Sequence, residues 1–288
     1  MEKDILTVIQ EHAGKFSKGQ RQIADFITKN YDKAAFLNAV KLSRAVGVSE
    51  STVVRFASML GYDGYPGMKR ALQQMVRNRL TSLQRIEVAR DTMDSKDILA
   101  SVLVSDMDKI RITLEEVDKE AFDAAVNAML AAKRIFVIGL RASAVLSSFM
   151  GFYLNLTREN VRVVGDTYVN EVFEQILNIG EGYVLFAISF PRYSRRTVRA
   201  LGYAKNRGAT TIGLTDGPSS PIAGLADIKL LARSEMVSFL DSLVAPLSLI
   251  NALIVTMGWR TEEEISENFS RLEHIWAEYD VFETGNGQ

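Results

Sequence analysis

Through the first 131 residues, apolar side chains recur three and four positions apart, the spacing of one helix face. Ile23, Phe26 and Ile27 follow this pattern in a helix that we expect to begin near Ser17. The helical stretches predicted in this way are 3–36, 67–90 and 98–131, with a polar break at 91–97. The front of the chain is therefore predicted to be all-α.

Two short helices with a tight turn between them are predicted within residues 42–60. Leu42 and Val46 lie one helical turn apart, Gly47 can adopt the left-handed conformation that ends a helix, and Ser49 can cap the next one. The second helix, about 50–60, has an apolar stripe for burial at Val53, Phe56, Ala57 and Leu60. This arrangement is typical of a helix-turn-helix, whose second helix enters the major groove of DNA.

Beyond residue 131 the pattern changes to short apolar runs that alternate with helical stretches. The runs predict strands at 134–140, 160–166, 182–189, 210–215 and 227–233. The predicted helices are 141–157, 169–179, 194–207, 239–257 and 261–282, with a short helical turn before the last strand. Strands joined by helices imply a doubly wound parallel five-stranded sheet. The apolar stretch 239–257 includes Asp241, Pro246 and Asn251, which favours a buried helix over a membrane span.

Charge is distributed unevenly along the chain. Residues 1–90 hold 15 Lys and Arg against 8 Asp and Glu, whereas residues 91–288 hold 19 against 27. A basic front third is the electrostatic signature of a nucleic-acid binder. The absence of cysteine excludes disulfides and thiolate sites and fits the cytoplasm, and two distant histidines make no metal cluster. We expect neither a metal nor another cofactor.

Several polar and basic side chains of the helix pair are placed to contact duplex DNA. Ser51, Thr52 and Arg55 face outward near the start of the second helix, and Arg55 is the best candidate for reading a base. The predicted DNA contacts are Lys41, Ser49, Ser51, Thr52, Arg55, Tyr62 and Lys69. The alternative is an ordinary helical hairpin with a solvated face, but the basic excess favours DNA.

A ligand site is predicted where three strands of the sheet end, because doubly wound sheets bind ligands beyond the carboxyl ends of their strands. Hydroxyls and guanidinium groups in the turns 139–143, 189–197 and 215–221 suit an anionic, hydroxylated ligand such as a phosphosugar. The predicted effector contacts are Gly139, Arg141, Ser143, Ser189, Arg192, Tyr193, Ser194, Thr215, Ser219 and Glu235. The alternative is that Ser143, Ser194 and Ser219 only cap helices.

The chain resembles the RpiR/MurR-type bacterial transcriptional regulators, in which a helix-turn-helix precedes a SIS (sugar isomerase) domain with a flavodoxin-like fold. The resemblance rests on LSRAVGVSESTVVRFASMLGYDGY, IGLRASA, ISFPRYSRRTV and GLTDGPSSPIAGLAD. It implies a cytoplasmic regulator that senses a phosphosugar or related metabolite, and a homodimer or homotetramer on operator DNA. The implied organisation is a DNA-binding domain at 1–80, a connecting segment at 81–117, a SIS domain at 118–260 and a terminal helix and tail at 261–288.

One turn departs from the family pattern. SIS domains commonly carry S-x-S-G-x-T-x-E after the third strand, where this chain reads Ser189-Phe190-Pro191-Arg192-Tyr193-Ser194-Arg195-Arg196. Pro191 has no N–H to offer, and we expect Arg192 not to reproduce an open glycine turn. The departure favours a small anionic metabolite in general, including sugar acids and keto acids. The rival function is a phosphosugar isomerase, for which Glu171, Glu174 and Glu235 are available as acid–base groups.

Overall fold

The computed structural model describes residues 5–77, 81–92, 97–165, 171–236 and 239–282. The chain forms two compact units. The first comprises Met1–Asp106 together with Glu235–Ser242, and the second comprises Met107–Ser234 together with Leu243–Gln288. The first unit therefore includes a short segment from far along the chain.

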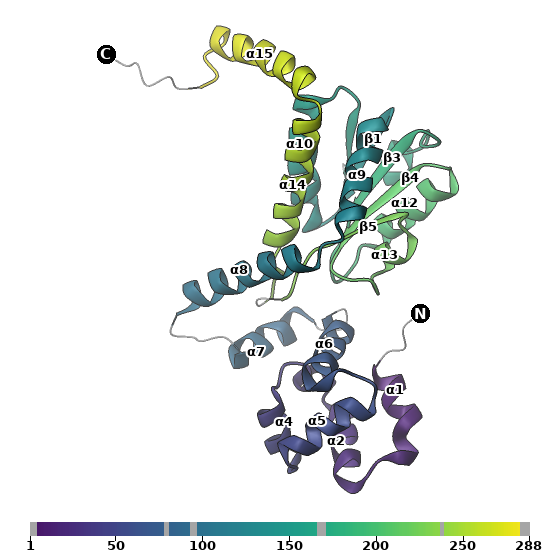
Figure 1. Cartoon of the computed structure of the whole chain (residues 1–288), viewed down its shortest axis with the longest axis vertical. Helices are drawn as coiled ribbons and strands as arrows, with labels where there is room; N and C mark the ends of the chain where they lie inside the picture. Colours follow the sequence, from purple (N-terminus) through teal and green to yellow (C-terminus); the bar gives the residue numbers. More distant parts are fainter. Residues whose placement is uncertain (1–4, 78–80, 93–96, 166–170, 237–238, 283–288) are drawn as a thin grey trace. The chain divides into compact units, whose positions relative to one another are not determined.

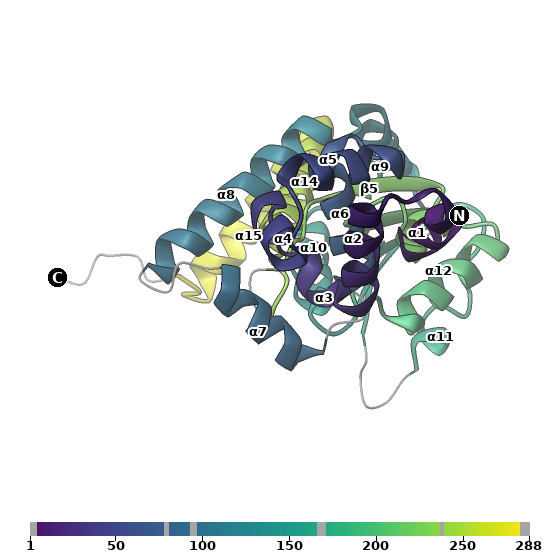
Figure 2. The ribbon, with the colours of Figure 1, turned by 90° about the horizontal axis from the view of Figure 1, so that it is seen from below.

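The first unit is a cluster of helices, as predicted (Figure 2). In chain order these are α1 (Ile5–His12), a 3₁₀ turn (Ala13–Lys15), α2 (Lys18–Lys29), α3 (Tyr31–Ala34), α4 (Ala39–Val46), α5 (Glu50–Met59), α6 (Gly64–Arg77) and α7 (Ser82–Thr92). Ser17 begins α2 with a capping box shared with Gln20, which confirms the predicted start. Ile23, Ile27 and Phe56 are fully buried, so α2 and α5 share one core.

All three predicted helical stretches of the front part are divided, and 3–36 contains α1, α2 and α3. Residues 67–90 divide into α6 and α7, because Thr81 and Gln84 form a capping box that starts a new helix. Residues 98–131 divide into α8 (Ile98–Glu116) and α9 (Lys119–Ala131), because the Asp118 carboxylate accepts a hydrogen bond from the Ala121 N–H at 2.9 Å. Of the expected polar break, residues 93–96 lie outside the described residues.

The second unit is built on a five-stranded, all-parallel sheet, as predicted (Figure 1). Its strands are β1 (Arg134–Gly139), β2 (Val161–Val164), β3 (Tyr183–Ile188), β4 (Thr210–Thr215) and β5 (Ile228–Leu231). They lie in the order β2-β1-β3-β4-β5, so the direction of winding reverses between β1 and β3. Ligands of doubly wound sheets bind at such a reversal.

Helices cover both faces of the sheet (Figure 1). On one face, α9, α10 (Ser143–Thr157) and α14 (Val244–Arg260) pack against Ile135 and Val137. On the other, α11 (Val172–Gln175), α12 (Arg195–Asn206) and α13 (Pro221–Leu225) pack against Phe136 and Ile138. Alternate residues of β1 therefore point to opposite cores, which explains why Ile135–Ile138 are all apolar.

Two further helices are shorter than the sequence predicts. Of the stretch 169–179, residues 169 and 170 are not described, and the rest contains only the four residues of α11. The helix is short because the buried Gln175 amide forms hydrogen bonds with the Gly165 backbone, and Ile176 and Ile179 are buried in the core. The apolar helix begins at Val244 rather than at 239, because Asp241 forms a β-bridge with Met236. None of the described helices is long and apolar enough to cross a membrane.

The terminal helix α15 (Glu262–Glu278) follows α14 and packs against α10 and α14. Ile265, Phe269, Leu272 and Trp276 of this helix are half-buried, and Tyr279 beyond it is exposed.

Candidate functional sites

The predicted helix-turn-helix is formed by α4 and α5. Gly47 ends α4 in the left-handed conformation, with φ at 78°. Ser49 caps α5, its hydroxyl accepting a hydrogen bond from the Thr52 N–H at 3.3 Å. Val53 and Phe56 are buried, so the opposite side of α5 faces outward.

The start of α5 brings four predicted DNA contacts together. The Ser49 hydroxyl lies 2.9 Å from that of Ser51 and 2.8 Å from that of Thr52. The Arg55 Nε donates to the Ser51 carbonyl at 3.2 Å, and one Nη lies 3.5 Å from the Ser51 hydroxyl. Ser51 and Arg55 are exposed and Thr52 is half-buried. Because these bonds are on the surface, Arg55 can exchange them for bonds to a base or phosphate at little cost.

Lys41 on α4 and Lys69 on α6 form a second positive centre. The pKa of Lys69 is lowered, first because the side chain is partly buried and second because the charge of Lys41 lies nearby. Two cations held near each other attract an anion such as a phosphate. Tyr62, in the turn between α5 and α6, is half-buried and packs against the core of the unit.

The lowered pKa of Lys69 predicts a pH-dependent contact with DNA. Lys69 loses its charge at a lower pH than an ordinary lysine, so duplex affinity should fall as the pH rises through that pKa. Lys69→Arg should keep the charge and flatten the fall over the same range, since a guanidinium stays protonated. Fluorescence anisotropy with a labelled duplex measures both profiles. Identical profiles would remove Lys69 from the phosphate contacts.

The three turns that are predicted to contact the effector begin at the same level of the sheet. Gly139 pairs with Ile188, and Ile188 pairs with Leu214, so the turns after β1, β3 and β4 begin side by side. Two of these turns flank the reversal between β1 and β3.

The turn after β1 is shaped by close packing. A Cβ on Gly139 would lie 2.4 Å from the Ser143 carbonyl oxygen, so this position accepts only glycine without a shift of α10. The helix begins without a side-chain cap, because the cap position is Ala142. Ser143 is buried in the first turn, and among the described residues its hydroxyl has no hydrogen-bond partner. The capping alternative therefore does not account for Ser143, and the uncapped amides of α10 suit an anion.

In the turn after β3, the two serine hydroxyls accept hydrogen bonds from nearby backbone N–H groups. The buried Ser189 hydroxyl accepts a hydrogen bond from the Ser194 N–H at 3.2 Å, and the Ser194 hydroxyl caps α12 by accepting one from the Thr197 N–H at 3.3 Å. Capping thus does account for Ser194.

The expectation that Arg192 cannot reproduce a glycine turn is wrong. Arg192 adopts φ of 64°, the left-handed region that glycine favours, and Arg141 in the turn after β1 adopts φ of 59°. A side chain held in this region costs about 1–3 kcal/mol, and such residues cluster at functional sites. Two exposed arginines in costly conformations therefore stand on either side of the winding reversal.

The turn after β4 contributes a carboxylate that the sequence analysis missed. Asp216 is largely buried and accepts hydrogen bonds from Tyr193 at 2.7 Å and from the buried Thr215 hydroxyl at 3.2 Å. Tyr193 thereby links two of the turns. The position of Asp216 directly after a strand was the available signal. Ser220, rather than Ser219, caps α13, and Ser219 is exposed.

The remaining acidic candidates differ in their surroundings. Glu235 belongs to the first compact unit, where its carbonyl accepts a hydrogen bond from the Ser242 N–H. Glu171 lies 3.8 Å from Arg196 in a half-exposed ion pair, and Glu174 is exposed. Within the described part of the chain, no group of His, Asp or Glu could hold a metal ion.

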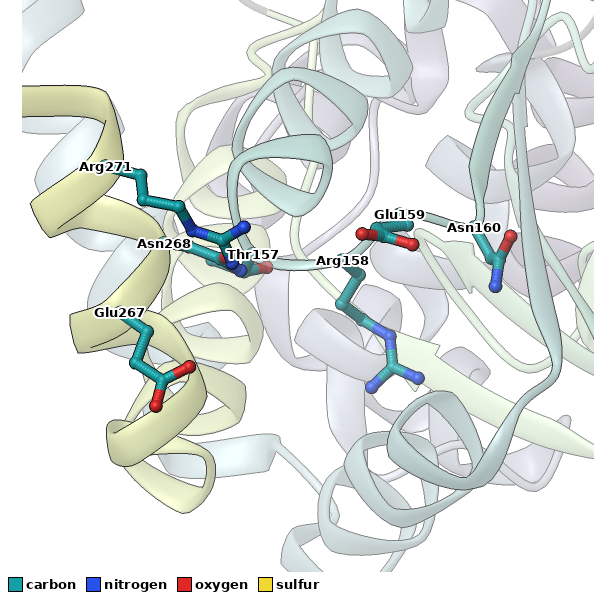
Figure 3. Close-up of a pocket in the computed structure, with 7 residues that line it drawn as sticks. All are labelled: Thr157, Arg158, Glu159, Asn160, Glu267, Asn268 and Arg271. Carbon is teal, nitrogen blue, oxygen red and sulfur yellow. The ribbon is translucent and has the colours of Figure 1, made fainter. Parts of the chain in front are cut away.

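A polar cavity of about 320 Å³ lies elsewhere in the second unit, between α15 and the segment that joins α10 to β2 (Figure 3). Its lining residues are Thr157, Arg158, Glu159, Asn160, Glu267, Asn268 and Arg271. The Arg158 guanidinium donates to the Leu130 and Ala132 carbonyls. The cavity lies at the amino end of β2, which is not where doubly wound sheets bind ligands.

A helix-turn-helix unit joined to a doubly wound α/β unit defines the class of protein, a DNA-binding protein with an additional α/β domain. Comparison with known families agrees with both parts. Residues 3–79 match the helix-turn-helix domain of the rpiR family, and residues 128–256 match the SIS domain. The chain therefore belongs to the RpiR-type transcriptional regulators with a SIS domain.

Two relatives resemble the chain over most of its length. An uncharacterised HTH-type transcriptional regulator of Caldanaerobacter subterraneus subsp. tengcongensis is 26% identical over 266 residues, which cover 91% of this chain and 93% of the relative. The HTH-type transcriptional regulator HexR of Pseudomonas aeruginosa is 25% identical over 279 residues, covering 94% of each.

Two solved structures share the fold. The sugar isomerase domain of an RpiR transcription factor from Sphaerobacter thermophilus is 28% identical, with a TM-score of 0.59 over 62% of this chain and 99% of that domain. NanR of Vibrio vulnificus, solved in complex with ManNAc-6P, is 22% identical, with a TM-score of 0.59 over 97% of this chain and 100% of NanR.

Proposed function

We propose that this protein regulates transcription by binding operator DNA through α4 and α5 and by sensing a small anionic carbohydrate metabolite, a phosphosugar or a sugar acid. The metabolite binds where β1, β3 and β4 end. It favours one arrangement of a homo-oligomer and so alters the spacing between two recognition helices. Such a regulator works in the cytoplasm, where the DNA is.

The observation that carries the proposal is the pairing of two chemistries in one chain. The exposed Arg55 cluster and the Lys41–Lys69 centre suit the polyanionic duplex. The uncapped start of α10 and the left-handed Arg141 and Arg192 suit a small anion. The ligand in the NanR complex, ManNAc-6P, has this chemistry. The ion pair of Glu171 and the exposure of Glu174 favour sensing over isomerisation.

Replacing Arg55 distinguishes sequence-specific contact with a base from sequence-independent attraction to the phosphates. Arg55→Ala should weaken binding to an operator selected from a random pool by roughly 1–3 kcal/mol, about 5–150-fold, with little loss on unrelated duplexes. Lys69→Ala should weaken binding to both by similar factors, because a phosphate contact carries no sequence information. Competition assays with the two duplexes measure the ratio. Equal losses for both variants on both duplexes would contradict the assigned roles.

The effector site is tested by a thermal-shift screen of the full chain with sugar phosphates, sugar acids and keto acids. A metabolite at 100 times its Kd stabilises the folded state by about 2.7 kcal/mol. Ser143→Ala should reduce the shift. Arg192→Gly should raise the melting temperature without ligand, since the strain at φ of 64° is relieved, and should also reduce the shift.

Ser58→Ala, a substitution of an exposed serine in the first unit, is the matched control and should leave the shift unchanged. Undiminished shifts in both effector-site variants would place the ligand elsewhere. Interconversion of a panel member into its isomer would favour the isomerase.

A further inference from the structure

The connection between β5 and α14 is divided between the two compact units. It leaves the second unit after Ser234, joins the first unit, and returns to the second unit at Leu243. The described residues that lie in the first unit are Glu235, Met236 and Phe239–Ser242, and we call them the strap. The chain therefore passes from the α/β sheet into the unit that carries the helix-turn-helix, and back again, within a few residues.

The strap is attached to the first unit at three points. The Asp241 carboxylate accepts a hydrogen bond at 2.9 Å from the guanidinium of Arg85 on α7, a side chain that is 2% exposed. The Ser242 hydroxyl donates to the Asp106 carboxylate on α8 at 2.6 Å. Met236 packs against the same apolar core as α5. Moving the strap would therefore disturb α7, α8 and the core that positions the helix-turn-helix.

The end of the strap that follows β5 is linked to one of the predicted effector turns. The Ala232 N–H donates at 2.9 Å to the carbonyl of Thr215, the last residue of β4 and a predicted effector contact. The Arg233 N–H donates at 2.9 Å to the buried Thr113 hydroxyl on α8, and the Arg233 guanidinium binds the Glu116 carboxylate. A shift of the turn after β4 is therefore passed directly to the residues that lead into the strap.

The other end of the strap leads into α14, which packs against α10. Only Leu243 separates the strap from Val244, the first residue of α14. The uncapped first turn of α10 contains Ser143, whose buried hydroxyl has no partner among the described residues. An anion bound at the start of α10 would therefore act on a helix that lies against α14. Both ends of the strap begin at elements that the proposed effector site also uses.

We propose that the strap carries the effect of effector binding from the α/β unit to the DNA-binding unit within a single chain. The role of the strap rests on the proposed function and adds an intrachain route to it. The connections at both ends are short and hydrogen-bonded or packed, so a displacement is transmitted rather than absorbed by slack. The rival route is α8, since this continuous helix also runs from the first unit into the second.

The first test needs neither ligand nor DNA. Inserting Gly-Ser-Gly at the junction Ser234–Glu235 adds slack and removes none of the contacts described above. Gly139→Ala supplies the displacement, because its Cβ would lie 2.4 Å from the Ser143 carbonyl oxygen and forces α10 to move. Hydrogen exchange of the α7 amides should become several-fold faster in Gly139→Ala than in the wild type, since the strap holds Arg85. In chains that carry the insertion, Gly139→Ala should leave α7 exchange unchanged.

The controls separate the strap from general destabilisation and from α8. Gly202→Ala, where no atom lies within 4 Å of the added Cβ, should leave α7 exchange unchanged with either strap. The same insertion after Gly180, before β3, should preserve the response to Gly139→Ala. Tyr193→Phe, which removes the hydrogen bond to Asp216 in the turn after β4, is a milder displacement and should also accelerate α7 exchange. Unchanged exchange in both displacement variants would overturn the proposal, and acceleration that survives the strap insertion would assign the coupling to α8.

The second test measures operator affinity by fluorescence anisotropy with and without each metabolite that gives a thermal shift, with glucose 6-phosphate as the first probe. In the wild-type chain the metabolite should change the affinity by about 5–150-fold, and in the strap-insertion chain by less than about two-fold. The insertion chain should keep the thermal shift and the affinity without ligand. A full response in the insertion chain would overturn the strap and leave the proposed function standing. No response in the wild type would overturn the proposed function and the role of the strap with it.

Discussion

Replacing Asp241 with alanine is expected to destabilise the first unit by about 3–5 kcal/mol, because it removes a carboxylate that the buried Arg85 guanidinium binds. The Arg85 guanidinium on α7 donates to the Asp241 carboxylate at 2.9 Å, and the side chains are 2% and 16% exposed. Native-state hydrogen exchange in α7 is the suitable readout, since a chain of two units need not unfold in one step.

Two comparisons sharpen the Asp241 experiment. Arg111→Ala removes an exposed cation that pairs with Asp108 and Glu115, and should leave exchange in α7 unchanged. The double variant Arg85→Met with Asp241→Leu should recover most of the loss, because an apolar pair of similar size needs no counter-charge. If Asp241→Ala alone left α7 as protected as in the wild type, the ion pair would not be what holds Glu235–Ser242 in the first unit.

Gly139→Ala is expected to cost about 3 kcal/mol, at the upper end of the range for overpacking, and to abolish the effector response. The added Cβ would lie 2.4 Å from the Ser143 carbonyl oxygen and 2.9 Å from the carbonyl carbon, so the backbone of α10 has to move. Moving α10 displaces the uncapped amides and the Ser143 hydroxyl. Urea unfolding and the thermal-shift screen measure the two effects.

Gly202→Ala is the matched control, since no atom lies within 4 Å of the added Cβ and the residue is inside α12. This change should stabilise the chain by about 0.5–1 kcal/mol through helix propensity. If Gly139→Ala were as harmless as Gly202→Ala, α10 would not need its close approach to β1.

The elements that periodicity specifies were predictable. The stripe at Val53, Phe56, Ala57 and Leu60 places α5. The five apolar runs give the strands of the sheet, most clearly for β1, β3 and β4, which are buried on both faces. Gly47 and Ser49 mark the turn between α4 and α5, since a left-handed glycine and a serine cap have local causes.

Features that depend on contacts far apart in the sequence were not predictable. The later start of α14 at Val244 follows from the attachment of Asp241 to Arg85, 156 positions away. Tyr65 anchors α6 by donating to the Leu37 carbonyl at 2.8 Å, and burial raises its pKa to about 12, yet its sequence context gives no hint of this role.

Within the candidate effector site, the sequence indicated which turns matter but not how the side chains divide their tasks. Capping occupies Ser194 and Ser220, whereas Ser143 is left without a partner among the described residues. Arg141 and Arg192 adopt positive φ angles, which arginine rarely does, so residue propensity alone predicts the wrong backbone conformation at both positions.

The most direct test of the account is the affinity of the full chain for its selected operator, measured across salt concentrations with and without each metabolite that gives a thermal shift. Affinity should fall steeply with salt, because the basic first unit displaces counterions from the duplex. At least one anionic metabolite should change the affinity at constant salt without being converted. An affinity that is insensitive to salt and unchanged by every metabolite that binds would contradict it.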